Sequence, residues 1–302
     1  MRDPHELYTL DSDLPELTAP VLLHTLPGFV DAGSAGRLLT RHLLDALPHR
    51  TLATFDVDGL IDHRSHRPLM IFAKDHWDGY AGHELTLHLV QDEADVPFLL
   101  LTGPEPDYHW EAFVGAVGEL VDRFDVRLTV GVNAIPMAVP HTRQVGVTAH
   151  GTRAELLIGY EPWLERVQVP GSVGALLEYR LGQRGRDAVG FAVHVPHYVA
   201  QAEYPEASLT LLDSVARATG LVLPTLALQE AADSTRAQID AQIAKSDEVE
   251  GIVHALEQQY DAWAGGRGQA PLLAGDGAGM PTADELGAEL ERFLAAQDRK
   301  DR

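Results

Sequence analysis

The sequence contains no cysteine and only three lysines. Without cysteine the chain has no disulfides, no thiolate metal ligands and no cysteine nucleophile, which suits a reducing compartment. Lys74, Lys245 and Lys300 are the only candidates for a lysine nucleophile or for a lysine that holds a nucleotide phosphate. The opening residues, MRDPHELYTL, lack the apolar core of a signal peptide, and no run reaches the roughly 20 apolar residues of a membrane-spanning helix. We therefore expect a soluble, cytoplasmic protein that does not bind membranes.

Positive charge is also scarce. The 45 acidic residues exceed the 23 basic residues, which gives a formal net charge of -22. A surface this acidic repels phosphate backbones, so we do not expect nucleic acid as a partner. The remaining composition is that of an ordinary globular protein, with 45% hydrophobic and 23% charged residues. A chain of 302 residues with this composition fits one large α/β domain with appendages.

Apolar runs of strand length alternate with segments of helical periodicity. VLLHTLPGF (21–29) predicts a buried strand closed by Pro-Gly, and the leucines of AGSAGRLLTRHLLDAL (32–47) then recur at helical spacing. The same patterns predict strands at 51–58, 69–73, 83–91, 96–103, 126–135 and 188–195, helices at 108–124, 172–183 and 206–220, and a hairpin formed by 145–152 and 153–160. This alternation predicts an α/β fold with a mainly parallel or mixed sheet sandwiched by helices.

The composition divides the chain into four parts. Residues 1–224 are predicted to form the α/β core domain. Residues 225–264 are predicted to form a long, acidic, amphipathic helical segment, because their large apolar side chains share one helical stripe. Residues 265–281 are predicted to be a Gly-rich linker, and 282–302 a C-terminal helix and tail that begins with a capping-box pattern. A tethered helix of this kind needs a surface to cover.

The turn GFVDAGSAG (28–36) has the position of a phosphate-binding loop, between a predicted strand and a predicted helix. Gly28 and Gly33 have the spacing of the two P-loop glycines, but Ser34 and Ala35 stand where lysine and Ser/Thr should follow. The pattern therefore favours a tight-packing turn over a nucleotide site.

The segment FDVDGLIDHRSHRP (55–68) collects aspartates and histidines of the kinds that bind metals: Asp56, Asp58, Asp62, His63 and His66. It lacks the calcium-loop pattern, because glycine directly follows its second aspartate and no glutamate closes the loop. Arg64 and Arg67 lie among these groups, so an ion-pair network is favoured over a metal cage. We expect neither a metal nor a cofactor.

LLLTGPEPDYHWEAF (99–113) places acidic residues at the end of a predicted strand. Open α/β sheets bind ligands at the carboxyl ends of their strands, so Glu105, Asp107 and Trp110 are candidate site residues. The alternative is structural: Asp107 would then be the N-cap of the helix that begins near Tyr108, and Glu105 a turn residue near the positive end of that helix.

Two histidines lie at the end of the last predicted core strand, in HVPHYVAQAEYP (194–205). Zinc-protease histidines are four apart on a helix with a glutamate between them, whereas His194 and His197 are three apart across Pro196. A histidine within a strand is usually a packed core residue, which is our interpretation of His194. His197 lies beyond the strand and is predicted to form a pocket rim with Tyr204.

Five segments, in this order and spacing, carry a family resemblance: IDHRSHRPLM, LLLTGPEPDYHWEAF, TRQVGVTAHGT, PGSVGALLEY and FAVHVPHYVAQAEYPEAS. Together they resemble the bacterial, actinobacterial-type branch of the proteasome assembly chaperone 2 (PAC2) family, over nearly the whole chain up to about residue 264. The resemblance implies an α/β fold similar to nucleoside phosphorylases. It also implies a chaperone-like role, since members in eukaryotes and archaea help to assemble or contact the proteasome α-ring and are not enzymes.

Two hypotheses of function follow. The first is a non-enzymatic assembly or interaction protein linked to the proteasome, which agrees with the lack of a G-x-S-x-G elbow or another catalytic motif. The alternative is a protein or enzyme that binds a small molecule such as a nucleoside or nucleotide on a phosphorylase-like fold. Its candidate pocket would be formed by Asp62, Arg64, Arg67, Glu105, Asp107, Trp110, His194, His197 and Tyr204.

The resemblance also implies self-association. Relatives with this fold assemble into rings or pairs, and by analogy we expect a homotrimer. Proteasome-docking relatives commonly end in a hydrophobic residue, a tyrosine and one final residue, whereas this sequence ends Lys300-Asp301-Arg302. We therefore do not expect such a tail to enter a ring pocket, and a protein partner such as a proteasome subunit would be held in another way.

Overall fold

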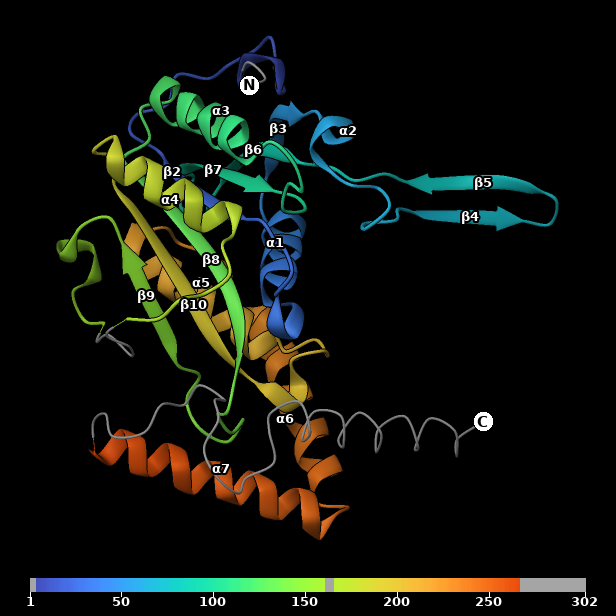
Figure 1. The fold of residues 1–302 in the computed structure, drawn as a ribbon, viewed down its shortest axis with the longest axis vertical. Coiled ribbons are helices and arrows are strands. Elements are labelled where there is room, and N and C mark those ends of the chain that lie inside the picture. Colours follow the sequence, from blue (N-terminus) through green and yellow to red (C-terminus); the bar gives the residue numbers. More distant parts are fainter. Residues whose placement is uncertain (1–3, 161–165, 267–302) are drawn as a thin grey trace.

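An eight-stranded mixed sheet forms the centre of the protein (Figure 1). The computed structural model describes residues 4–160 and 166–266, so the predicted C-terminal helix and most of the predicted linker lie outside the described residues. The strands β7, β2, β8 and β10 defined below run parallel, and the remaining neighbours are antiparallel. In spatial order the strands are β1 (Tyr8–Leu10), β3 (His49–Phe55), β6 (Thr86–Gln91), β7 (Pro97–Thr102), β2 (Val21–Thr25), β8 (Leu128–Met137), β10 (Ala188–Pro196) and β9 (Val147–Gly151).

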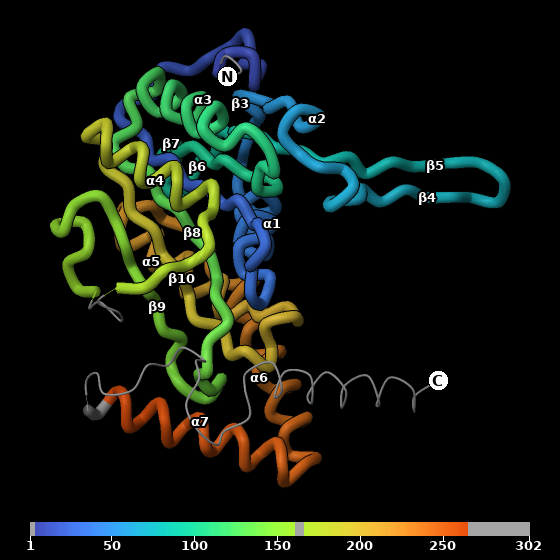
Figure 2. The backbone as a smooth tube through the Cα atoms, in the orientation of Figure 1, coloured from blue at the N-terminus to red at the C-terminus, as the bar shows by residue number. Residues whose placement is uncertain are grey.

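Helices cover both faces of this sheet (Figures 1 and 2). On one face α1 (Ala35–Ala46) and α5 (Pro205–Thr219) pack into one hydrophobic cluster, and on the other α3 (Trp110–Arg123) and α4 (Val173–Gln183) pack into a second. The prediction of an α/β sandwich around a mixed sheet is confirmed. The shorter helical turns are η1 (Pro4–Glu6), η2 (Ala32–Ser34), α2 (Val57–Leu60), η3 (Ala154–Leu157) and η4 (His197–Val199).

Strand β2 shows why two helix layers are needed. All five residues of VLLHT are buried. Successive side chains of a strand point to opposite faces, so Leu22 joins the cluster under α3 and α4 while Leu23 joins the cluster under α1 and α5. Such a strand is stable only when both of its faces are covered. The buried strand predicted from this apolar run is confirmed.

The predicted hairpin of 145–152 with 153–160 is wrong. Strand β9 pairs antiparallel with β10, and the chain after β9 turns through η3 instead of returning as a strand. All nine residues of β10 are buried, so this strand needs a neighbour on each side, and β9 supplies the outer one. The partner of β9 lies beyond α4 in the sequence, where a local pattern does not reveal it.

A two-stranded hairpin projects away from the body (Figures 1 and 2). It consists of β4 (Leu69–Ala73) and β5 (His76–Ala81), and we call residues 69–81 the hairpin arm. LMIFA is a strand as predicted, but it lies outside the main sheet, and the polar letters of HWDGYA do not predict β5 at all. Within the described residues, neither strand contributes to a hydrophobic cluster of the body.

Two helices follow the core, α6 (Leu226–Ile243) and α7 (Asp247–Gly266). The segment 225–264, predicted as one helical unit, is thus divided near Ser246, whose hydroxyl accepts a hydrogen bond from the backbone N–H of Val249. Acidic residues in the first turn of α7 favour this new start, because they lie at the positive end of the helix dipole. In the part of the chain that the structure describes, no helix combines the length and apolar character needed to cross a bilayer.

Polar contacts fix both C-terminal helices to the loop between β8 and β9. The Tyr198 hydroxyl accepts from the His141 backbone N–H at 2.7 Å and donates to His141 Nδ1 at 2.7 Å. His141 Nε2 then donates to the Asp240 carboxylate of α6 at 3.0 Å. Arg143 pairs with Asp261 of α7 at 2.7 Å, and this hydrogen bond raises the pKa of the guanidinium. The loop therefore holds α6 and α7 by directional contacts.

Two glycines lie side by side in the sheet, on the face that α4 covers. Gly131 of β8 and Gly190 of β10 are register partners. Imidazole rings fill the space above them: a Cβ on Gly131 would lie 2.7 Å from His24 Nε2, and one on Gly190 would lie 2.1 Å from His150 Cε1. Burial lowers the pKa of His24 to about 4, so this ring is neutral at pH 7. The glycines are needed to admit the two rings.

We expect Gly131→Ala to lower the free energy of unfolding by about 2 kcal/mol, because the added Cβ would lie 2.7 Å from Nε2 of His24, whose ring is buried. Gly190→Ala should have a smaller effect, since the side chain of His150 is 47% exposed and can turn outward. Urea unfolding measures both. Gly251→Ala on α7, where an added Cβ meets nothing within 4 Å, is the control and should be neutral or slightly stabilising. A Gly131→Ala variant as stable as the wild type would contradict this packing account.

Candidate functional site

The carboxyl ends of β2 and β7 form one side of a crevice. The two strands are parallel neighbours, yet α1, which follows β2, and α3, which follows β7, lie on opposite faces of the sheet. Open α/β sheets bind ligands at such switch points, because the diverging connections leave an opening. A cavity of about 680 Å³ lies there, which is within the size range of small-molecule pockets.

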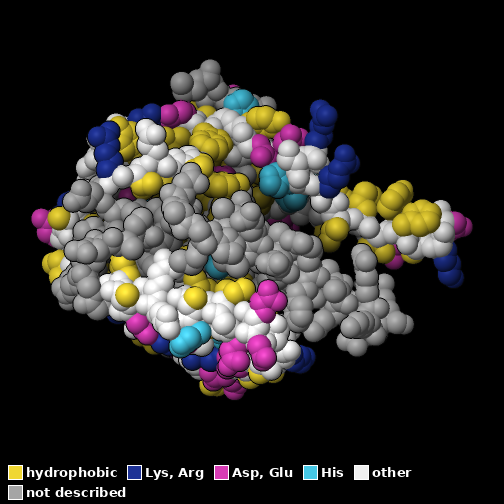
Figure 3. Space-filling view, turned by 60° about the horizontal axis from the view of Figure 1, so that its bottom comes forward, with side chains coloured by type: hydrophobic (Ala, Val, Ile, Leu, Met, Phe, Trp, Pro, Cys, Tyr) yellow, Lys and Arg dark blue, Asp and Glu magenta, His cyan; other side chains and the backbone are white. Residues whose placement is uncertain are grey.

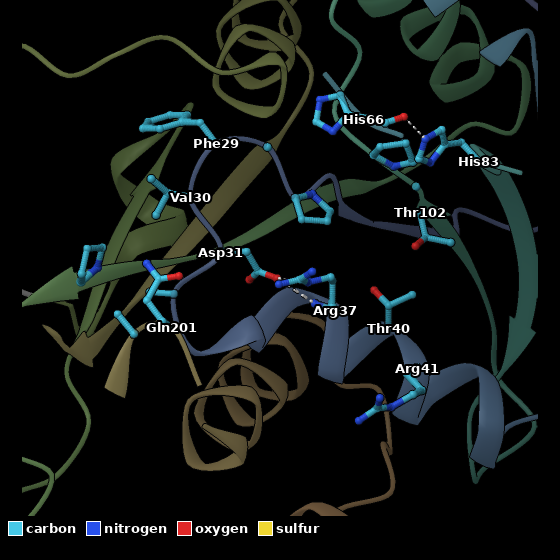
Figure 4. A pocket seen from close by; sticks show the side chains of 17 residues that line it. Phe29, Val30, Asp31, Arg37, Thr40, Arg41, His66, His83, Thr102 and Gln201 are labelled. Atoms are coloured by element: carbon cyan, nitrogen blue, oxygen red, sulfur yellow. Dashed lines mark hydrogen bonds and ion pairs between the residues drawn. The ribbon is translucent and has the colours of Figure 1, made fainter. Parts of the chain in front are cut away.

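Segments far apart in the sequence line this crevice (Figure 4). Arg37 and Arg41 project from α1 on one wall. His66 and His83, which lie on either side of the hairpin arm in the sequence, form the opposite wall. Phe29, from the turn between β2 and α1, stands at the rim with 70% of its surface exposed. The crevice thus combines cationic, imidazole and aromatic groups.

Asp31 determines the form of the turn that begins α1. Its carboxylate accepts hydrogen bonds from the backbone N–H groups of Gly36 at 2.8 Å and Arg37 at 3.3 Å. A bound phosphate would need these same N–H groups at the start of the helix. Gly33 has a φ of 65°, and a Cβ on it would meet the Tyr204 side chain at 2.8 Å. In this structure GFVDAGSAG is therefore a packing turn closed by its own carboxylate.

Glu105 joins the crevice turn to helix α4. Its carboxylate accepts a hydrogen bond from the backbone N–H of Val173, the first residue of α4, at 2.6 Å. Gly28 makes room for this contact, since a Cβ on it would lie 1.9 Å from the Glu105 carboxylate. Burial raises the pKa of Glu105, and the hydrogen bond from Val173 opposes that rise. Glu105 therefore lies at the positive end of α4, whereas the structural alternative predicted α3.

Asp62 and Asp107 meet beside the crevice. Asp107 Oδ2 accepts from the Asp62 backbone N–H at 2.6 Å, and Asp107 Oδ1 lies 3.3 Å from His66 Nε2. Asp62 accepts from the backbone N–H of Arg64 at 2.9 Å, and this bond lowers the pKa of Asp62. The structural alternative, in which Asp107 is the N-cap of α3, is wrong: His109 takes that position, because the Asp107 carboxylate is turned toward the loop that contains Asp62.

Trp110, Arg64 and Arg67 do not line the crevice. Trp110 donates its Nε1–H to the Pro106 carbonyl at 2.6 Å and packs against the cluster under α3 and α4. Arg64 and Arg67 are exposed near the start of the hairpin arm. Across residues 4–160 and 166–266, no three His, Asp or Glu side chains converge in a way that would hold a metal ion.

His194, His197 and Tyr204 lie away from the crevice lining. His194 is buried in β10, with Nε2 2.8 Å from the hydroxyl of Thr148 on β9. His197 begins η4 and is partly buried, which lowers its pKa. Tyr204 is only 1% exposed, and its hydroxyl donates to Glu206 at 3.0 Å. The prediction of Tyr204 as a pocket rim is wrong, because its side chain fills the core beneath the turn that begins α1.

The sequence pattern missed the charged groups that do line the crevice. Arg37 and Arg41 are four residues apart on α1 and therefore share a helix face directly after the strand–turn–helix start. That spacing is the sequence pattern from which the two arginines could have been predicted as site residues. His83 has no such signal, since only the folded chain brings it opposite α1. The predicted residues Asp107 and Glu105 adjoin the crevice indirectly, through their contacts with His66 and Gly28.

Comparison with known proteins gives the family. A model of the PAC2 family matches residues 25–243, which is more than half of the chain. The chain belongs to the PAC2 family. The predicted membership is thereby confirmed. No curated protein matches the chain.

Solved structures of three actinobacterial proteins share this PAC2 fold. A Mycobacterium tuberculosis protein of unknown function is 46% identical, with 87% of this chain and 91% of that chain covered and a TM-score of 0.84. A Corynebacterium glutamicum protein of unknown function is 41% identical, with coverages of 87% and 99% and a TM-score of 0.84. A Mycobacterium tuberculosis proteasome-assembly chaperone homologue is 23% identical, with coverages of 77% and 99% and a TM-score of 0.71.

We expect His194 to make the stability of this PAC2 protein depend on pH. Burial lowers its pKa to about 4 from an ordinary 6.5. As the pH falls below 6.5 the unfolded chain binds a proton that the folded chain does not, so the free energy of unfolding decreases until about pH 4, by up to about 3 kcal/mol for this group. Urea unfolding of His194→Gln, which keeps a polar partner for Thr148 but does not titrate, should show a smaller decrease between pH 6.5 and 4.5. Identical pH profiles for the two proteins would rule out this role of His194.

Proposed function

We propose that this PAC2 protein is a non-enzymatic, assembly-chaperone-like interaction protein that works as a homo-oligomer. The hairpin arm is the observation that carries the proposal. Its large apolar side chains are exposed to solvent, and Figure 3 shows hydrophobic side chains along this projecting element.

The arm is apolar on both faces because of its strand register. Met70 pairs with Tyr80 and Phe72 with Trp77 across the two strands, so these side chains share a face. The rings of Phe72 and Trp77 touch, with centroids 5.0 Å apart. Leu69 and Ile71 alternate with Met70 and Phe72, and therefore lie on the other face. All six side chains are 49–79% exposed.

A hairpin of this kind does not persist bare in water. An isolated two-stranded hairpin is marginally stable at best. Burial of each large apolar side chain contributes about 1.5–3 kcal/mol, which is the stabilisation that the solvent-exposed arm lacks. Exposed apolar patches of this extent mark interaction surfaces. The arm is thus built to be covered by another chain.

The chain that covers it is a second copy. The arm has to be covered in every molecule, and another copy is the partner that is present in matching amount. The protein is strongly acidic, with a formal net charge of -22, so two molecules repel each other. The hairpin arm projects from the body, and its large exposed side chains are apolar. Reciprocal arms around a symmetry axis close into a ring, for which we keep the trimer as the proposed state.

The family supports the role of this oligomer. A Mycobacterium tuberculosis relative with this fold is a proteasome-assembly chaperone homologue. We carry that role to this chain as an analogy, with a proteasome α-ring subunit as the proposed partner.

Phe72→Glu should dissociate the oligomer, because it places a charge in the apolar surface that a neighbouring copy would cover. Sedimentation velocity should show three chains for the wild type and one chain for the variant. Ile158→Glu is the matched control: Ile158 is 83% exposed but lies outside the arm, so this variant should sediment like the wild type. A wild-type protein that sediments as a monomer over the micromolar range would refute self-association through the arm.

The proteasome link is tested by assembly of purified α-ring subunits from the same cell. With the wild-type chain present we expect a complex with these subunits on size exclusion, and faster formation of rings. Phe72→Glu should lose this effect if the oligomer is the active form, while Ile158→Glu should retain it. The absence of any complex together with an unchanged rate of ring formation would remove the chaperone-like role and leave self-association standing.

A further inference from the structure

The crevice between β2 and β7 exposes positive charge on a strongly acidic protein. The side chains of Arg37 and Arg41 are 66% and 61% exposed. Asp31 is the one carboxylate among the described lining residues, and its side chain is only 7% exposed. The Asp31 oxygens already accept hydrogen bonds from Gly36 and Arg37. A molecule that enters therefore meets two guanidinium groups and a carboxylate whose hydrogen bonds are already made.

Both arginines keep donors for a ligand. Arg37 uses Nε for Asp31 and Nη2 for the hydroxyl of Ser34, at 3.3 and 2.9 Å, which fixes its plane in the crevice (Figure 4). Arg41 has one long contact of 3.4 Å with Glu203, and such an exposed pair contributes little. The two residues lie one helical turn apart on α1. Figure 4 shows the Arg41 side chain turned away from Arg37, so Arg41 has to change its rotamer to reach an anion that Arg37 holds.

The opposite wall supplies polar groups held in place by the fold. His83 Nε2–H donates to the His66 carbonyl at 2.7 Å, which directs the rest of its ring. His66 is positioned by Asp107, 3.3 Å away. The hydroxyls of Thr40 and Thr102 lie between the two walls (Figure 4). Phe29, with its ring open to solvent at the rim, offers a flat apolar face.

We infer that this crevice binds a small organic anion, whose phosphate or carboxylate group is held by Arg37 and Arg41 and whose flat ring lies against Phe29. Guanidinium groups match the planar, two-oxygen face of a carboxylate or phosphate, and aromatic rings stack on one another. The cavity of about 680 Å³ accommodates a molecule of this size. Binding of this anion requires neither residues 69–81 of the hairpin arm nor a proteasome subunit.

Isothermal titration at pH 7 and low salt, with the full chain, tests the inference. The probes are AMP and 4-hydroxybenzoate, each compared with its parts: adenosine and inorganic phosphate for AMP, and phenol for 4-hydroxybenzoate. We expect AMP to bind at least about tenfold more tightly than adenosine and inorganic phosphate, or 4-hydroxybenzoate to bind at least about tenfold more tightly than phenol, because a charge-assisted pair and a stacked ring each contribute to affinity. If AMP shows this gain in affinity the ligand carries a phosphate, and if 4-hydroxybenzoate shows it the ligand carries a carboxylate.

Variants assign the binding to the crevice. Arg41→Gln should weaken the anion by about tenfold, and its side chain is exposed enough that the fold is retained. Phe29→Ala should weaken the ring-bearing anion and leave inorganic phosphate unchanged. Arg217→Gln is the matched control, an exposed arginine paired with Asp213 on α5, and should bind as the wild type does.

Two results would overturn the inference. One is that neither anion binds the wild type more tightly than its neutral counterpart. The other is that Arg41→Gln, shown by urea unfolding to be as stable as the wild type, binds the anion with unchanged affinity.

Discussion

The four parallel strands β7, β2, β8 and β10 set the requirement on which the rest of the molecule depends. Strands β2 and β10 are buried along their whole length, so helices must cover both faces, and Leu22 and Leu23 show the two directions within one strand. The connection after β2 therefore goes to one face and the connection after β7 to the other. The crevice is the opening that this division leaves, so the same burial that builds the core also creates the place where a ligand can enter.

Acidic residues around the crevice accept hydrogen bonds from backbone N–H groups. Asp31 holds the first N–H groups of α1, Glu105 holds the first N–H of α4, and Asp107 holds the N–H of Asp62. Each carboxylate joins two segments that are distant in sequence or closes a turn, and each gains a hydrogen bond to its charged form. Acids at strand ends are natural candidates for catalysis, but here each of the three already accepts a hydrogen bond from the backbone. The arginines of α1 keep N–H groups for a ligand, so the site is cationic, whereas acidic residues were the expected candidates.

The sequence predicts the layers of this fold well because they follow from local periodicity. Runs such as FLLL of β7 are apolar without interruption, and α1 repeats its leucines at helical spacing. Strand pairing over a long sequence distance cannot be predicted from a local pattern: β9 pairs with β10, which lies beyond α4 in the sequence, and the polar residues of β5 do not have the pattern of a strand. The residues that line the crevice could not be predicted for the same reason. His83 and Arg37 line the same crevice only through the chain's topology, whereas Tyr204, which follows the last core strand in the sequence, is turned into the core.

The hairpin arm also has a consequence for how the chain is made. LMIFA is a short, uncharged, β-forming stretch of the type that stacks into aggregates, and it leaves the ribosome before β8, β10 and α5 have been synthesised. Such stretches in natural proteins are flanked by charges and prolines that interrupt stacking. Arg67 and Pro68 precede this one, and Lys74 and Asp75 follow it. Arg67 does not line the crevice, but its charge beside LMIFA opposes aggregation of the nascent chain.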